Sequence, residues 1–198
     1  MSDQDQALRR VVAIVAALNL AYFGIEFAVA LSIGSVSLFA DSADFFEDAA
    51  VNFLIFAALG WSATRRAKVG MMLSAVLLAP ALAFLWTLWT KVHAPVPPAA
   101  IPLSVTGVGA LAINLFAASL LARHRHHAGS LTRAAFLSAR NDVLANIAII
   151  AAGLITLRFA SLWPDVIVGL GIAVMNLDAA REVWTTARDE HRIAKAQP

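Results

Sequence analysis

The amino-acid sequence predicts an all-α membrane protein with six transmembrane helices and both termini in the cytoplasm. Three observations support this fold class. The chain has 198 residues, of which 60% are hydrophobic and only 14% charged, whereas globular domains are roughly 45–50% apolar and about 25% charged. Six stretches of the chain are long enough to cross a bilayer, which takes about 20 predominantly apolar residues. The basic residues, finally, gather on one side of these stretches.

The six predicted spans follow one another with short connections. They cover roughly residues 11–33, 36–62, 69–92, 101–122, 134–157 and 164–186. The first two spans meet directly at Gly34 and Ser35. The third and fourth are separated by the segment HAPVPPAAIP, whose prolines favour an extended linker over a helix.

The last two spans have recognisable starts. Ser130, in the polar segment RHRHHAGSLTR, is predicted to cap the helix of the fifth span. Pro164 and Asp165 suit the first turn of the sixth, where a missing N–H is harmless and a negative charge meets the helix dipole. Residues 187–198 resemble a short cytoplasmic tail, too short for a second domain. We therefore expect residues 1–198 to form a single transmembrane domain with no C-terminal soluble domain.

The distribution of basic residues sets the predicted orientation. Of the 15 Lys and Arg residues, 12 fall on one side of the six-span arrangement. They are Arg9, Arg10, Arg65, Arg66, Lys68, Arg123, Arg125, Arg133, Arg181, Arg188, Arg192 and Lys195. The positive-inside rule places that side, and with it both termini, in the cytoplasm. The first apolar run lacks a small-residue cleavage site, so we interpret it as a retained helix and not as a signal peptide.

Several classes of function are disfavoured by composition. The chain has no Cys, which excludes disulfides and Cys-based zinc or iron–sulfur sites. Its five His residues lie outside the spans, which argues against haem or copper held between helices. The net charge of +2 comes from basic residues at span ends, so we expect no nucleic-acid partner. We expect a multi-pass protein of the bacterial inner (plasma) membrane.

Two polar stripes cross the apolar stretches. One consists of Asp44, Asp48 and Asn52, and the other of Ser138, Asp142 and Asn146. Residues at i, i+4 and i+8 lie along one face of a helix. A carboxylate in hydrocarbon is costly and usually faces a partner, a cation or a water-filled cavity. Two matching stripes on different helices could therefore form both walls of one cation site.

The three carboxylates of these stripes are the leading candidates for metal or proton binding. The alternative is that they pair with a buried Arg or cap a helix kink, but Arg140 is the only basic residue at that depth. Oxygen ligands suit the harder divalent cations. Protonated acids would form the empty state, which makes exchange of protons for metal a natural mechanism.

The neighbouring polar residues allow two interpretations each. Ser138 lies where a fourth ligand is expected, but a membrane-buried Ser more often bonds to the carbonyl at i−4. Asn141 is a possible accessory ligand, and Asp41 is either an accessory ligand or an interfacial residue. A salt bridge of Arg140 with Glu47, Glu26 or Asp178 is the structural alternative to a proton relay. The HRHH run at residues 124–127 is either a solvated basic loop or a segment that binds metal weakly.

The order of these residues resembles that of the cation diffusion facilitator (cation efflux) family. The segment LNLAYFGIEFAVALSIGSVSLFADSADFFED carries most of the resemblance. Its matching positions are Asn19, Glu26, Gly34-Ser35, Ala40-Asp41, and Asp44 with Asp48. Further matches are Asn114, the His-bearing loop, the AAFLSARNDVLAN run, and the Trp-Pro-Asp sequence of residues 163–165. The resemblance covers nearly the whole chain.

The resemblance implies export of a divalent transition metal from the cytosol in exchange for protons. It also implies a homodimer that alternates between inward-open and outward-open states. The family's site takes two ligands from each of the second and fifth helices, which correspond here to Asp44, Asp48, Ser138 and Asp142. A His is usual at the position of Ser138. Its loss favours manganese, iron or cobalt, or weakens binding altogether.

We therefore expect a proton-coupled divalent cation antiporter, with Mn, Fe, Co, Zn or Cd as the candidate substrates. The partners are the lipid bilayer, the metal ion and protons, and we expect no further cofactor. The alternative is a non-transporting or degenerate metal-binding membrane protein of the same fold. An intramembrane enzyme is not expected, because no Ser/His or HExxH arrangement exists in the sequence.

Overall fold

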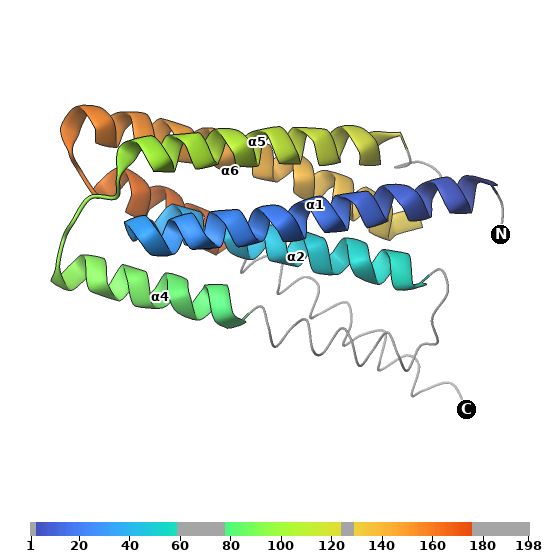
Figure 1. The fold of residues 1–198 in the computed structure, drawn as a ribbon, viewed down its shortest axis with the longest axis horizontal. Helices are drawn as coiled ribbons and strands as arrows, with labels where there is room; N and C mark the ends of the chain where they lie inside the picture. Colours follow the sequence, from blue (N-terminus) through green and yellow to red (C-terminus); the bar gives the residue numbers. More distant parts are fainter. Residues whose placement is uncertain (1–2, 59–77, 124–128, 176–198) are drawn as a thin grey trace.

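The structure is a computed structural model that describes residues 3–58, 78–123 and 129–175. The described residues form helices joined by turns and short extended segments. The helices are α1 (Asp3–Ile33), α2 (Val36–Ala58), α4 (Leu78–His93), α5 (Ala100–Ala122), α6 (Gly129–Phe159) and a last helix, Trp163–Met175. The long helices run nearly side by side in Figure 1. The predicted all-α fold class is confirmed for these residues.

Three of the helices are long and apolar enough to cross a membrane. The segments are Gln6–Ile33, Ala100–Ala122 and Asn141–Phe159, and Trp163–Met175 is a shorter apolar helix. Large apolar side chains such as Val105 (65% exposed) and Leu144 (67% exposed) cover the outside of the bundle. Such a surface suits contact with lipid and not with water. The chain is an integral membrane protein.

Two of the helices begin several residues earlier than the apolar stretches that predicted them. Helix α1 starts at Asp3 and not near residue 11, and α6 starts at Gly129 and not near residue 134. The length of an apolar run matches the thickness of the hydrocarbon core of the membrane. The helix itself can continue beyond that core into the polar headgroup region. Ser130 lies inside α6, so its predicted role as a cap is wrong. Residues 59–62, 69–77 and 176–186 of the predicted spans and the tail 187–198 lie outside the described residues.

The connections agree with the sequence prediction. Gly34 joins α1 to α2 with a φ of 61°, a left-handed conformation that glycine adopts without a steric penalty. Ser35 then caps α2, because its Oγ accepts a hydrogen bond from the Leu38 amide at 3.1 Å. The proline-rich segment between His93 and Ala100 contains no helix.

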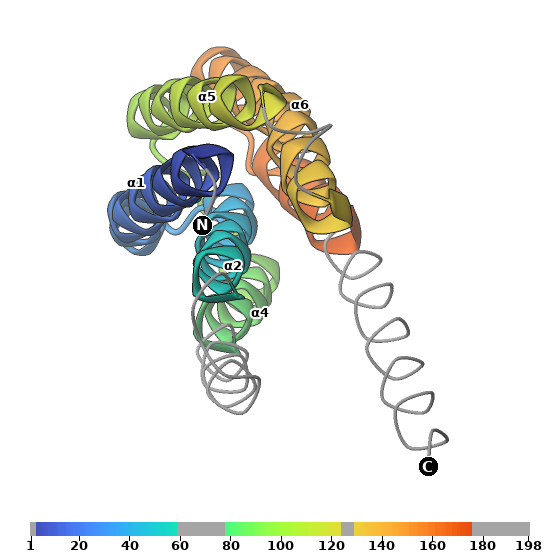
Figure 2. The same cartoon turned by 90° about the vertical axis from the view of Figure 1, so that its right-hand side faces the viewer.

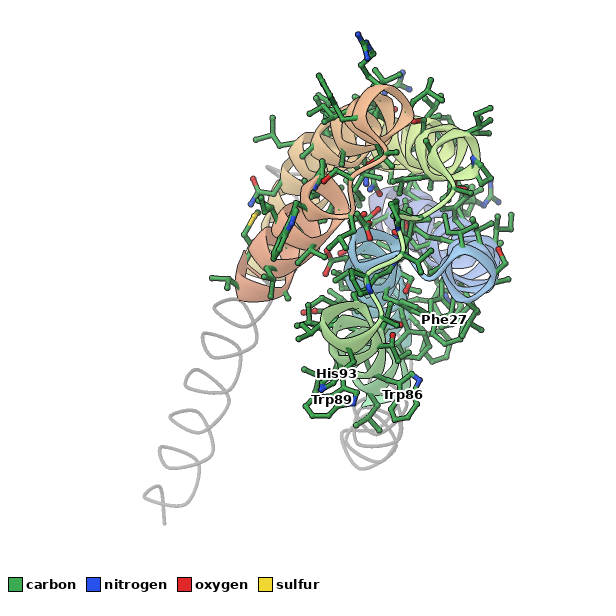
Figure 3. All side chains as sticks on the ribbon, turned by 90° about the vertical axis from the view of Figure 1, so that its left-hand side faces the viewer. Phe27, Trp86, Trp89 and His93 are labelled. Carbon is green, nitrogen blue, oxygen red and sulfur yellow. The ribbon has the colours of Figure 1, made fainter. Side chains whose placement is uncertain are left out.

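Four helices form a ring around a common interior. Helix α1 contacts α2 and α5, and α6 contacts α2 and α5, while α4 packs mainly on α2. Figure 2 looks along the bundle and shows α4 lying beside this ring. Trp86 and Trp89 of α4 point away from the bundle in Figure 3 and are 69% and 61% exposed. Residues of α1, α2, α5 and α6 that turn inward therefore share one buried space.

Candidate metal site

Three carboxylates of α2, Asp41, Asp44 and Asp48, lie on the side of the helix that faces the ring interior. Asp41 and Asp48 are buried, and Asp44 is half-buried. Their spacing of three and four residues places them along one side of the helix. Because α2 packs against both α1 and α6, this side of α2 is shielded from lipid.

Ser138 connects the two predicted stripes. Its Oγ donates a hydrogen bond to Asp48 Oδ1 at 3.0 Å, across the interface between α6 and α2. The hydroxyl proton is thus used between helices, and not in a bond to the carbonyl one turn earlier in α6. The structure brings Ser138 and Asp48 together, as one metal site built from both stripes would require.

The other two predicted ligands lie near this pair. Asp142 lies near enough to Asp48 for their charges to interact. Asp44 is near enough to both for their charges to interact. In the described part of the chain, however, no three His, Cys, Asp or Glu side chains converge on a point that would hold a metal ion. Metal binding would therefore require the carboxylates to turn toward one another.

The two predicted accessory ligands differ in position. Asn141 is exposed on α6. Asp41 is fully buried, and its Oδ2 accepts a hydrogen bond from Asn146 Nδ2 at 2.7 Å. Asn146 Oδ1 in turn accepts one from Asn114 Nδ2 at 3.0 Å. These amides link α2, α6 and α5 on the side of Asp44 that is nearer the α1–α2 turn.

Sequence reasoning missed the partner of Asp165. Its carboxylate accepts four hydrogen bonds from the start of α2: from the Ser35 and Ser37 hydroxyls at 2.6 Å each, the Val36 amide at 2.8 Å and the Ser37 amide at 3.1 Å. Asp165 lies in the first turn of its own helix, as predicted, but these bonds satisfy free N–H groups of another helix. The two serines at the start of a helix, Ser35 and Ser37, were the available signal.

Some predicted alternatives fall outside the described part of the chain. The side chain of Arg140, the whole of Asp178 and the HRHH run are not described, so their proposed salt bridges and metal contacts stay predictions. Within the described residues, Lys91 is the only buried basic side chain. Its Nζ donates to the backbone carbonyl of Val96. Lys91 therefore bonds to the loop after its own helix and not to the carboxylates of α2.

Comparison with known proteins adds one finding. The chain matches the family described as "Cation efflux transmembrane domain" over residues 12–189. No curated protein matches the chain.

Proposed function

Because the chain belongs to the cation efflux family, we propose that it is a proton-coupled antiporter exporting a divalent transition-metal cation from the cytosol. The membrane domain and a metal cation as substrate follow from the family. The coupling to protons, the direction of transport and the choice of metal are our proposals. The same proposal makes the chain a transporter and not an enzyme, with no cofactor besides the transported ion.

The observation that carries the proposal is the contact between Ser138 and Asp48. It joins α6 to α2 at the level where three carboxylates, Asp44, Asp48 and Asp142, lie near one another. Three carboxylates cannot stay ionised together in a low-dielectric interior without a cation. A site of this kind is neutralised either by a metal ion or by protons.

This competition supplies the proposed mechanism. Metal arriving from the cytosol displaces the protons. The hydroxyl of Ser138 then turns its oxygen toward the ion. Protons arriving from the opposite side neutralise the carboxylates again and release the metal there. Each exchange keeps the net charge of the buried site low. Metal and protons therefore occupy the site in turn, and this alternation gives antiport.

The donor atoms favour a hard metal ion. All four predicted ligands, Asp44, Asp48, Asp142 and Ser138, offer oxygen. Oxygen donors suit manganese, whereas zinc binds more tightly where imidazole or thiolate is present. We therefore propose Mn²⁺, Fe²⁺ or Co²⁺ ahead of Zn²⁺ or Cd²⁺. A homodimer held by membrane helices and residence in a bacterial inner membrane are also part of the proposal.

The test is metal uptake into proteoliposomes with an imposed pH gradient, using the five ions singly. We expect accumulation of one of the harder ions by the wild-type protein and its loss in Asp142→Asn. Asn141→Ala is the matched control, because this neighbouring residue on α6 is exposed. Undiminished flux in folded Asp142→Asn would contradict the proposal.

The alternative is a non-transporting metal-binding protein of the same fold, and Ser138 is the residue that favours it. A hydroxyl bonded to Asp48 is a weaker ligand than an imidazole. Under this alternative, Ser138→His raises metal affinity but produces no flux. Flux by the wild-type protein excludes the alternative directly.

A further inference from the structure

The ring interior contains many more buried acceptors than donors without a partner. Seven buried side-chain atoms lack a hydrogen-bond partner among the described residues, and six of them are oxygens. The oxygens are Asn19 Oδ1, Glu26 Oε1 and Oε2, Asp41 Oδ1, Asn52 Oδ1 and Asn114 Oδ1. A buried acceptor without a donor costs roughly 1–3 kcal/mol, and more when it is charged. Protons or a cation would satisfy these acceptors.

Most of these oxygens belong to one connected group. Glu26 of α1 is fully buried, both of its carboxyl oxygens lack a partner, and it lies near enough to Asp41 for the two charges to interact. Two carboxylates only accept, so they could bond to each other only by sharing a proton. Asp41 Oδ2 is held by Asn146, and Asn146 by Asn114. Each of the four helices of the ring thus contributes one residue.

The amide chain determines which oxygens remain free. Asn114 donates through Nδ2 to Asn146 Oδ1, and Asn146 donates through Nδ2 to Asp41 Oδ2. Asp41 Oδ1 and Asn114 Oδ1 are left without a donor. The network therefore uses the amide donors of Asn114 and Asn146 and leaves acceptors of Asp41 and Asn114 without a partner.

No described basic side chain neutralises this pair. Lys91, the only buried base among these residues, donates to the carbonyl of Val96. The nearby hydroxyl of Tyr22 donates to the carbonyl of Thr106 at 2.6 Å. A carboxylate buried in hydrocarbon is neutralised either by a proton or by a partner of opposite charge. A mobile cation would supply that charge.

We propose that Glu26 and Asp41, assisted by Asn114 Oδ1, form a second subsite for a hard divalent cation. Two carboxylates balance the charge of one such ion, and carboxylate and amide oxygens are the donors that hard cations prefer. The subsite lies toward the α1–α2 turn from Asp48, because seven residues of helix separate Asp41 from Asp48, or about 10 Å. The inference deepens the proposed function, since the subsite holds the transported ion on its path beyond the Asp44–Asp48–Asp142 site.

The test counts bound Mn²⁺ on the purified full chain by equilibrium dialysis, with electron paramagnetic resonance to distinguish bound from free ion. We expect two ions per chain in the wild-type protein. Glu26→Gln and Asp142→Asn should each retain one ion, and the double variant none. Glu47→Gln is the matched control: it removes an acid of α2 by the same change and should retain two.

The proposal is overturned if folded Glu26→Gln binds as many ions as the wild type, or if Glu26→Gln and Asp142→Asn abolish the same single ion. Should Glu26→Gln fail to fold, Asp41→Asn provides the same count. Failure of the subsite is distinguishable from failure of the proposed function. Unchanged stoichiometry with flux intact rejects only the subsite, whereas loss of one ion without any wild-type flux rejects only the antiporter.

Discussion

Ser138 offers a neutral hydroxyl at the position where a His imidazole is usual in the cation efflux family. The hydroxyl donates to Asp48 Oδ1, so a metal ion would have to displace a hydrogen bond before it gained this ligand. An imidazole would instead present a nitrogen lone pair that suits zinc. The choice of side chain at this one position therefore bears on which metal is preferred.

Replacing Ser138 by His is expected to raise Zn²⁺ affinity relative to Mn²⁺ by at least about tenfold, or ~1.4 kcal/mol. Competition binding on purified protein measures the ratio. Ser119→His is the control, because Ser119 is exposed on α5 and bonds only to the Phe116 carbonyl of its own helix. An equal change in both variants would show that the effect does not arise at the α2–α6 interface.

At the scale of one element, the start of α2 depends on a residue from the last helix. Asp165 is fully buried, and its carboxylate accepts from two backbone amides and two hydroxyls at the first turn of α2. It therefore acts as a cap supplied from another helix. The negative charge also faces the positive end of the α2 dipole.

Asp165→Ala is expected to lower the free energy of unfolding by about 2 kcal/mol or more, because it removes a helix cap and leaves buried donors unpaired. Unfolding in detergent measures the change. Ser32→Ala serves as the control: Ser32 is exposed and bonds to Val29 of its own helix, so we expect a change within about 0.5 kcal/mol. Equal stability of Asp165→Ala and wild type would refute the capping role.

The last helix also approaches α2 closely at Gly169. A Cβ there would lie 2.8 Å from the backbone N of Ser37 and 2.8 Å from the backbone C of Val36. Backbone atoms at a helix start cannot move aside as a flexible side chain would, so Gly169→Ala should destabilise by roughly 1–3 kcal/mol. Gly171→Ala meets nothing within 4 Å and should be neutral or slightly stabilising. A comparison of the two thermal unfolding midpoints decides the point.

At the scale of the whole molecule, the orientation in the bilayer is open to a direct test. The chain contains no Cys, so a single introduced thiol is the only label site. We expect Ala94→Cys, exposed in the segment between α4 and α5, to react with a membrane-impermeant maleimide in intact cells. Ala7→Cys, exposed near the start of α1, should react only after lysis. The reverse pattern would invert the predicted topology.

Proton coupling is also a property of the whole molecule. In proteoliposomes we expect metal to move in the direction opposite to the imposed proton flow. Reversing the proton gradient should therefore reverse the direction of metal flux. A protonophore that collapses the gradient should reduce concentrative uptake to the level of protein-free vesicles. Undiminished accumulation after collapse would contradict antiport while leaving metal transport itself intact.

Local patterns in the sequence were sufficient for the membrane class and most of the helices. The apolar run over 101–122 predicted α5 to within one residue of its start, because hydropathy is a property of consecutive residues. The turn at Gly34 and Ser35 was predicted for the same reason. The start of α6 was missed, since its first residues are polar and carry no hydropathy signal.

The sequence by itself determined that the chain is helical, apolar and crossed by two polar stripes, because composition and helical period depend on near neighbours alone. Contacts between distant residues were decided only in the tertiary structure. The bond between Ser138 and Asp48, the cap from Asp165 and the nearness of Glu26 to Asp41 depend on which helices pack together and how each is rotated. Those rotations result from packing the whole ring at once, and no single segment encodes them.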